Sequence, residues 1–503
     1  MKRKRILSGL FFLCLFLLLL LSFSLNWTGD NFGGVGFDEI MFHLNMPLKG
    51  TGQSFIGSYF RKALFPAVGI TVEILVGMAI LKALLPGKVK EKLRTISRFS
   101  IFAGILIIAI WGGLASYRAQ RWFGFYDYVN SIIHKSTFLE QEFISAKDVE
   151  ITFPKTKRNL IYIFVESGET SAQDTANGGL MSTNYIPEMT EIARSNISFS
   201  QSELIEGAAV APLCGWTIAG MVAETAGVPL KLYWMRNGMD QYATFLPGVI
   251  SLGEILEEQG YRNYFMAGSD FDFGGRTDYC TQHGNYEILD YKVALKEGII
   301  PENYHVWWGF EDEKLYQWAK DKLTEISQKD DPFNFTFLTV DTHCQDGYVC
   351  DLCDKEYSDQ YANVWRCASR QLDDFISWCQ EQPFYENTTI IICGDHCSMD
   401  SDFYGQYTLS SQKGSTVRKV YNVFLNSTVE PEREKNRQFT TMDIFPSTLA
   451  ALGAEIEGDR LGLGVNLFSG VPTLAEEYGY DYMFEELSKT SQFYNRELLY
   501  PKE

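Results

Sequence analysis

The residues with the clearest capacity for chemistry follow long apolar segments. In "NLIYIFVESGETS" an uninterrupted apolar and aromatic run ends at Glu166, and in "TTIIICGDHCSMD" another ends at Asp395 and His396. Such runs are typical of strands that are buried on both faces of a sheet. A carboxylate at the end of a buried strand needs a positive partner, so the sequence raises the question of what that partner is.

Two more apolar segments end in the same way. "FNFTFLTVDTHCQDG" reaches Asp341 and His343, and "YRNYFMAGSDFDFGGR" carries Asp270, Asp272 and Arg276. Ligands of open α/β sheets gather at the carboxyl ends of the strands. We therefore expect these side chains to share one edge of a sheet.

Glu166, Asp395 and His396 form an oxygen-rich set that suits a divalent cation. Any one of them could instead cap a helix or join a salt bridge. Their joint occurrence at the ends of buried strands favours a metal site.

A hydroxyl nucleophile is suggested by "APLCGWTIAGMVAETAG", in which a helix is predicted to open near Thr217. Judged by spacing alone, a threonine there is an ordinary N-cap or first-turn residue. A helix N-terminus also concentrates donors that can hold a phosphate. A metal-bound threonine in that position could be activated as a nucleophile.

The elements that must position these residues alternate between strand and helix, which predicts an α/β domain with a mostly parallel central sheet flanked by helices. The predicted strands are 159–166, 262–268, 333–341, 388–394 and 420–426. The predicted helices are 187–195, 216–226, 250–259, 311–327, 357–381 and 441–452.

The composition agrees with a large folded domain and excludes one class of partner. Of the 503 residues, 46% are hydrophobic and 15% aromatic, which argues against disorder. The net charge of −19 argues against nucleic acid as a partner, since such proteins normally present a basic face.

Apolar segments near the N-terminus predict about three transmembrane helices, at about 6–25, 63–85 and 99–115. A cleaved signal peptide is the alternative for the first, but its apolar core would be shorter and no small-x-small cleavage site follows. The connection 86–98 carries five basic residues and one acidic residue, and the N-terminus begins with "KRKR" after Met1. The positive-inside rule assigns both to the cytoplasm, so three crossings would deliver the rest of the chain outside.

These features divide the chain into four predicted regions. They are a membrane region (1–117), an interfacial connector (118–154), an extracytoplasmic catalytic domain (155–470) and a C-terminal tail (471–503).

Ten cysteines, nine of them beyond the first predicted helix, suit an oxidising compartment. Cys344, Cys350, Cys353 and Cys367 cluster within 24 residues. Disulfides, free thiols and a metal knuckle at "CDLC" all remain open, since no second CxxC pair stands at zinc-ribbon spacing.

Several segments, in order along 150–470, resemble the sulfatase-like branch of the alkaline phosphatase superfamily: "NLIYIFVES", "GWTIAGMVA", "FGGRTDYCTQHG", "TVDTHCQDGY" and "GDHCSMD". Within that branch the chain looks like the phosphoglycerol transferases of osmoregulated periplasmic glucans and, more distantly, the lipoteichoic acid synthases. A formylglycine sulfatase is a poorer match, because Cys214 stands in "CGWTI" rather than in a C/S-x-P-x-R context.

The resemblance implies roles for particular residues. Glu166, Thr217, Asp395 and His396 would ligate one divalent metal, most commonly Mn²⁺ with Mg²⁺ or Zn²⁺ as alternatives, and Thr217 would also be the nucleophile. Arg276 would bind the substrate phosphate, and His343 would bind substrate or transfer a proton. Asp270 is a weaker candidate for contacting glycerol hydroxyls.

The function implied is transfer of glycerol phosphate from phosphatidylglycerol to an envelope glycan or polymer through a phospho-threonine. The enzyme would reside in a bacterial cytoplasmic membrane as a multi-pass protein with its N-terminus in the cytoplasm. A phosphoethanolamine transferase and a lipid-headgroup phosphodiesterase remain enzymatic alternatives. A membrane-anchored envelope-assembly protein with a degenerate site is the non-enzymatic one. The acceptor stays open.

Overall fold

The structure is a computed structural model that describes residues 2–31, 35–45, 53–84, 87–231, 245–407 and 413–501. The chain forms two compact units. The smaller comprises residues 1–35 and 51–127, and the larger comprises 36–50 and 128–503. The short segment 36–50 thus belongs with the larger unit, although the sequence predicts that it lies inside the membrane region.

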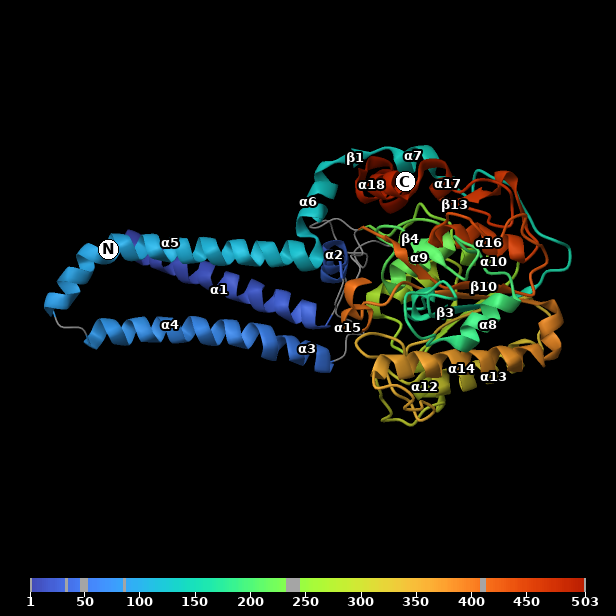
Figure 1. Cartoon of the computed structure of the whole chain (residues 1–503), viewed down its shortest axis with the longest axis horizontal. Coiled ribbons are helices and arrows are strands. Elements are labelled where there is room, and N and C mark those ends of the chain that lie inside the picture. Colours follow the sequence, from blue (N-terminus) through green and yellow to red (C-terminus); the bar gives the residue numbers. More distant parts are fainter. Residues whose placement is uncertain are drawn as a thin grey trace. The chain divides into compact units, whose positions relative to one another are not determined.

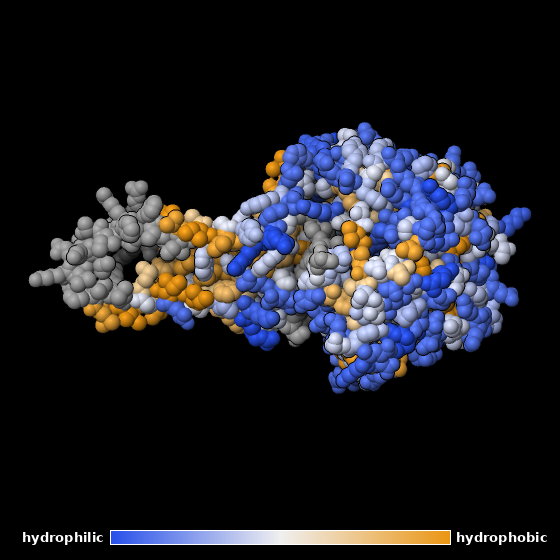
Figure 2. All heavy atoms as spheres, viewed as in Figure 1, coloured by the Kyte–Doolittle hydropathy of each residue, from blue (hydrophilic) through white to orange (hydrophobic). Residues whose placement is uncertain are grey.

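The smaller unit is helical, and hydrophobic side chains gather on its surface (Figure 2). Its helices are α1 (Lys2–Asn31), α3 (Gln53–Tyr59), α4 (Phe65–Leu84) and α5 (Gly87–Phe123), with a π-helical segment at Phe60–Leu64. Among the described residues, two stretches are long and apolar enough to cross a bilayer, Gly9–Asn31 and Ile56–Ile80. These correspond to the first two predicted crossings.

The third predicted crossing, 99–115, lies within α5, where part of the side chains fall outside the described residues. The count of three crossings therefore stays a prediction. The predicted loop at 86–98 is wrong in conformation, because α5 begins at Gly87. Lys, Glu, Leu and Arg dominate that stretch and favour a helix.

The larger unit is built on a six-stranded sheet with the order β10-β8-β3-β7-β5-β6. All neighbouring pairs are parallel except β10 with β8, so the predicted mostly parallel sheet is confirmed. The strands are β3 (Asn159–Val165), β5 (Arg262–Ala267), β6 (Glu287–Leu289), β7 (Phe333–Leu338), β8 (Thr388–Gly394) and β10 (Asn422–Leu425).

Helices cover both faces of this sheet (Figure 1). Side chains of β3 alternate between two buried clusters: Leu160, Tyr162 and Phe164 join one, while Ile161, Ile163 and Val165 join the other. The first cluster includes α9 (Thr217–Ala226), α10 (Leu252–Glu258), α11 (Arg276–Gln282), α16 (Ile444–Ala451) and α18 (Tyr480–Ser488). The second includes α8 (Pro187–Ser195), α12 (Tyr291–Glu297), α13 (Asp312–Ile326) and α14 (Gln360–Gln380).

Shorter segments tie the C-terminal region to the unit. The strand β1 (Lys135–Ser136) pairs in parallel with β14 (Thr490–Ser491), so the predicted tail is structurally part of the larger unit. The helix α2 (Phe37–Asn45) belongs to this unit as well, with Phe42 buried in the first cluster.

Candidate functional site

Three predicted metal ligands meet at the carboxyl ends of two adjacent strands. Glu166 follows β3 and the pair Asp395 and His396 follows β8, and the two strands run parallel with Val165 opposite Gly394. All three side chains are buried, and one ligand atom from each lies within 4.8 Å of the others. The edge of the sheet that the sequence indicated therefore brings them together.

The geometry around His396 fits a small cation. Its Nε2 atom lies 3.4 Å from each of three oxygens: Oε1 of Glu166, Oδ2 of Asp395 and Oγ1 of Thr217. Its Nδ1 lies 2.9 Å from the carbonyl oxygen of Cys397, which can only accept, so Nδ1 carries a proton and Nε2 is the nitrogen that can bind an ion once its own proton is lost. Ligand atoms about 2.1 Å from one ion at tetrahedral angles are about 3.4 Å apart.

A turn at Ser167, which the sequence did not single out, sets the two carboxylates. Ser167 has a φ of 56°, its N–H donates to Oδ1 of Asp395 (2.8 Å), and its hydroxyl donates to Oε1 of Glu166 (2.8 Å). The N–H of His396 donates to the same Oδ1 (2.9 Å). In the described part of the chain, Oδ2 of Asp395 is buried without a hydrogen-bond partner, so it is available as a ligand atom.

Charge in this cluster is unevenly distributed. Burial would lower the pKa of His396, but Asp395 and Glu166 raise it to about 10. Burial, followed by the charge of Glu166, raises the pKa of Asp395 to about 7.

The neighbouring histidines affect Glu166 differently. Burial would raise the pKa of Glu166, but His343 and His396 lower it to about 2. Burial lowers the pKa of His343 itself, so His396 carries the positive charge beside Glu166 more readily than His343 does. The two carboxylates of Glu166 and Asp395 therefore create a negative potential that stabilises a proton on His396. The same negative potential would stabilise a divalent cation bound in its place.

Thr217 stands at the N-terminus of α9, as predicted. Trp216 is the N-cap residue, with a φ of −143°, and the cap has no side-chain hydrogen bond. Gly220, one turn later, faces the carbonyl oxygen of Asp395, which a Cβ atom there would approach to 1.8 Å. The missing side chain thus lets α9 lie directly against the segment that holds the carboxylate.

Arg276 begins α11 and is buried. Its Nε donates to the carbonyl of Phe273 (3.0 Å) and its Nη2 to the carbonyl of Asp270 (2.8 Å). Burial lowers the pKa of Arg276, and Glu166 is the strongest charge opposing that shift. The guanidinium is therefore fixed in orientation and lies within the field of the metal cluster.

The carboxylate of Asp270 has structural partners. Its Oδ1 forms an ion pair with Lys292 (2.7 Å) and accepts from the N–H of Asp272 (3.0 Å). Its predicted contact with glycerol hydroxyls stays a prediction.

His343 is partly buried beside Trp308, with 4.7 Å between ring centroids. Its Nδ1 lies 2.7 Å from the carbonyl oxygen of Cys344, so the proton is on Nδ1 and Nε2 is a proton acceptor. Trp308 also contacts Phe273, the residue whose carbonyl holds Arg276. One aromatic wall thus connects the two predicted substrate-binding residues.

A buried ion pair that the sequence did not reveal supports the loop after His396. Nε of Arg418 donates to Oε2 of Glu169 (2.8 Å), and its Nη2 donates to the carbonyl of Ser398 (2.7 Å). The N–H of Ser398 donates to Oε1 of Glu169 (3.0 Å). Arg418 and Glu169 therefore hold the loop that follows His396 in its conformation.

The helix α2 also reaches the surroundings of the site. The ring of Phe42 lies 5.5 Å from that of Trp216, and the ring of His43 is stacked 5.6 Å from that of Phe273. Through these contacts α2 lies against Trp216, the N-cap residue of the helix that begins at Thr217, and against Phe273, whose carbonyl accepts a hydrogen bond from Arg276.

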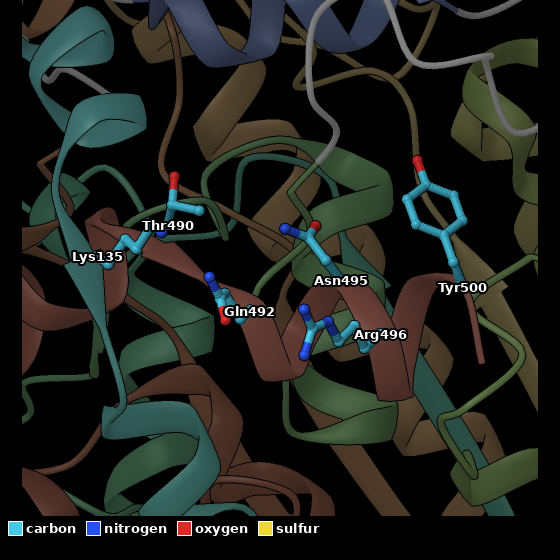
Figure 3. Close-up of a pocket in the computed structure, with 6 residues that line it drawn as sticks. All are labelled: Lys135, Thr490, Gln492, Asn495, Arg496 and Tyr500. Carbon is cyan, nitrogen blue, oxygen red and sulfur yellow. The ribbon is translucent and has the colours of Figure 1, made fainter. Parts of the chain in front are cut away.

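A cavity of about 330 Å³ lies elsewhere in the larger unit (Figure 3). Its lining residues are Lys135, Thr490, Gln492, Asn495, Arg496 and Tyr500. None of them is a predicted site residue, and the lining lacks the carboxylate and imidazole set of a metal centre.

Comparison with known proteins identifies the family of this chain and agrees with its fold. The family model described as Sulfatase matches residues 158–454. A phosphoglycerol transferase I of Xanthomonas axonopodis pv. citri is 28% identical over 452 residues, which cover 88% of this chain and 59% of that protein. A phosphoglycerol transferase I of Escherichia coli is 27% identical over 453 residues, covering 88% and 54%. The chain thus spans between half and three fifths of the length of these relatives.

Among solved structures, a protein of the alkaline phosphatase superfamily from Vibrio parahaemolyticus superposes with a TM-score of 0.50 at 18% identity. The superposition covers 71% of this chain and 82% of that one, and it supports the fold assignment alone. The resemblance drawn from the sequence is confirmed.

Proposed function

Because this chain belongs to the sulfatase family, we propose that it is a membrane-anchored, metal-dependent phosphoglycerol transferase. Its donor would be phosphatidylglycerol and its acceptor a hydroxyl of an envelope glycan or polymer. The observation that carries the proposal is the position of Thr217: its Oγ1 lies 3.4 Å from Nε2 of His396, whose other neighbours are the carboxylates of Glu166 and Asp395. The choice of phosphoglycerol as the transferred group rests on the names of the two relatives, both phosphoglycerol transferase I.

One divalent cation, most commonly Mn²⁺ with Mg²⁺ or Zn²⁺ as alternatives, would be held by Glu166, Asp395, His396 and Thr217. When bound, it lowers the pKa of the threonine hydroxyl. Two observations fit this assignment: Oδ2 of Asp395 is buried without a hydrogen-bond partner in the described part of the chain, and Nδ1 of His396 faces a carbonyl oxygen, which leaves Nε2 to bind the ion after losing its proton.

The reaction follows from the remaining side chains. Oγ1 of Thr217, whose hydroxyl proton passes to solvent, forms a bond to phosphorus as the bond from phosphorus to the diacylglycerol oxygen breaks. The diacylglycerol oxygen takes up a proton from solvent, so phosphoglyceryl-threonine remains and diacylglycerol is released. The guanidinium of Arg276 stabilises negative charge on the phosphoryl oxygens. In the second displacement, Nε2 of His343 accepts the proton of the acceptor hydroxyl, whose oxygen replaces Thr217 on phosphorus.

The membrane topology belongs to the same proposal, with the N-terminus in the cytoplasm and the larger unit outside. Residues 36–50 and 128–503 form one unit, so the chain between them must cross the bilayer an even number of times. Ile56–Ile80 supplies one candidate crossing there. The predicted crossing at 99–115 would supply the second, which supports three crossings in total.

The test is a lipid-turnover assay with the full chain in detergent, with Mn²⁺ and either phosphatidylglycerol or phosphatidylethanolamine labelled in an acyl chain. We expect diacylglycerol from phosphatidylglycerol, abolished by chelation and by Thr217→Ala. The control is Thr324→Ala, which alters an exposed threonine on α13 and should leave turnover unchanged.

Each alternative has its own result. Release from phosphatidylethanolamine alone would assign a phosphoethanolamine transferase. Release of glycerol phosphate into water without need of an acceptor would assign a phosphodiesterase. If neither lipid is turned over by folded, metal-loaded protein, the lipid-donor proposal is wrong and the non-enzymatic alternative gains support.

A further inference from the structure

A second group of ligand-forming side chains lies outside the site described above. The sulfur atoms of Cys350, Cys353 and Cys367 all lie within 4.8 Å of one another. The distance from Sγ of Cys350 is 3.6 Å to Cys353 and 3.8 Å to Cys367. Cys350 and Cys367 are buried, whereas Cys353 is partly exposed.

The local backbone brings the three thiols together. The N–H of Cys353 donates to the carbonyl of Cys350 (3.1 Å), which closes a turn and directs both ends of the CxxC segment to one side. Cys367 comes from the second turn of α14, which begins at Gln360. The cluster therefore joins the segment that follows His343 to a helix of the core.

Two side chains of α14 place N–H donors or positive charge beside the sulfur atoms. Nε2 of Gln371, one turn along α14 from Cys367, lies 3.4 Å from Sγ of Cys367 and 3.7 Å from Sγ of Cys350. Arg370 adds positive charge beside the cluster and donates to the carbonyl of Leu352 (3.3 Å) within the CxxC turn. N–H donors and a cation are the groups that stabilise thiolate ligands.

The sulfur separations decide between two kinds of linkage. A disulfide needs about 2.05 Å between its sulfurs. Thiolates bound to one zinc ion at about 2.3 Å in tetrahedral geometry are about 3.8 Å apart. The observed 3.6 Å and 3.8 Å match the second value.

We propose that Cys350, Cys353 and Cys367 form a binding site for one thiophilic divalent cation of the zinc class. The three sulfurs bind as thiolates, and each thiol that is protonated beforehand releases its proton to solvent when the ion binds. Within the described part of the chain the cluster supplies three ligand atoms, so solvent provides the fourth on the side of the partly exposed Cys353. The ion pins the turn that follows His343 to α14.

The full chain in detergent, purified without chelators, tests this proposal with zinc and cobalt(II) as probes. The zinc content is measured in an Asp395→Asn/His396→Ala background, which disables the candidate site at Thr217 so that the remaining ion reports the cysteines. Cobalt(II) is added to the otherwise unaltered chain, where a sulfur-to-cobalt charge-transfer band arises only from thiolate ligation. We expect about one zinc per chain and the cobalt band.

Cys353→Ser should reduce the intensity of the cobalt band and weaken zinc binding by about tenfold or more. Because Cys353 is partly exposed, this variant is the least disruptive of the three to folding. Cys379→Ser is the matched control, since Cys379 is another cysteine of α14 that lies outside the cluster, and it should keep both signals.

The proposal is overturned if the chain carries no zinc in the double-variant background and shows no cobalt band. It is equally overturned if peptide mapping finds two of the three cysteines joined by a disulfide. Lipid turnover is not a readout in either experiment, so failure here leaves the proposed transferase activity untouched.

Discussion

Gly220 of α9 lies so close to Asp395 that a Cβ atom at position 220 would stand 1.8 Å from the carbonyl oxygen of residue 395. The helix that begins at Thr217 and the segment that ends β8 are therefore in backbone contact. The position of the hydroxyl depends on that contact, because it lies three residues before the glycine on the same helix.

Replacement of this glycine should displace the nucleophile. We expect Gly220→Ala to lower the free energy of unfolding by about 1–3 kcal/mol, as overpacking does, and to reduce turnover beyond what the stability loss explains. Thermal unfolding and lipid turnover measure the two effects. Gly77→Ala is the control, since a Cβ at Gly77 would meet no atom within 4 Å. Equal effects of both substitutions would contradict the prediction.

Arg276 should contribute through the fixed orientation of its guanidinium. We expect Arg276→Ala to lower kcat/KM for the lipid donor by about 10²–10³-fold, the usual cost of losing one donor to a transition-state oxyanion. Arg276→Lys should restore only part of the activity, because it keeps the charge and loses the fork that the carbonyls of Phe273 and Asp270 hold.

The control for Arg276 is Arg262→Ala, which removes an exposed arginine of β5 that pairs with Asp331. Its activity should remain unchanged. Full activity in Arg276→Ala with bound metal would remove this residue from the proposed mechanism.

The buried pair of Glu169 and Arg418 should matter for stability far more than a surface pair does. Their side chains are 0% and 1% exposed, so Arg418→Met leaves an uncompensated carboxylate and should cost about 3–5 kcal/mol. The exposed pair of Arg194 and Glu191 is the control, and Arg194→Met should cost about 0–1 kcal/mol. Denaturant unfolding of both variants compares the two values, and similar losses would argue against a structural role for the buried pair.

Metal affinity should rise with pH because His396 must lose its proton to bind. Its pKa in the metal-free protein is raised to about 10, so the stability that this proton provides is complete below about pH 6.5 and is lost as the pH rises through about 10. The metal-loaded form has no such proton to lose.

The increase in Tm on adding Mn²⁺ should therefore widen from about pH 7 to about pH 9, with affinity growing about tenfold per pH unit for each proton displaced. Calorimetry at several pH values measures both quantities. A His396→Ala variant that still binds the ion should show a shallower pH dependence. An affinity that does not vary with pH would contradict the assignment of His396 as a ligand.

Much of the sheet and the core of the site could be predicted from the sequence because the signals are local. The apolar run before Glu166 predicts 159–166 and the strand is Asn159–Val165, while the run before Asp395 predicts 388–394 and the strand is Thr388–Gly394. Parallel strands end at one edge, so the polar residues that follow them meet there.

The features that sequence analysis missed depend on contacts between distant segments. Glu169 and Arg418 are 249 residues apart, and no sequence pattern around either residue predicts that they form a pair. The positive φ of Ser167 is unusual for a residue with a side chain, so composition alone does not predict the turn. The stacking of His43 on Phe273 joins a segment before Ile56–Ile80 to one far beyond it.

The position of α2 has a practical consequence for producing the catalytic part without its helices. A fragment starting at residue 128 would contain the whole sheet but would lack Phe42, which is 1% exposed and packs on Trp216. The face that α2 covers would then be open to water, next to the N-cap of Thr217. Such a fragment should be less soluble and less well ordered at its nucleophile than one to which residues 36–50 are supplied, either as an added peptide or joined through a flexible linker.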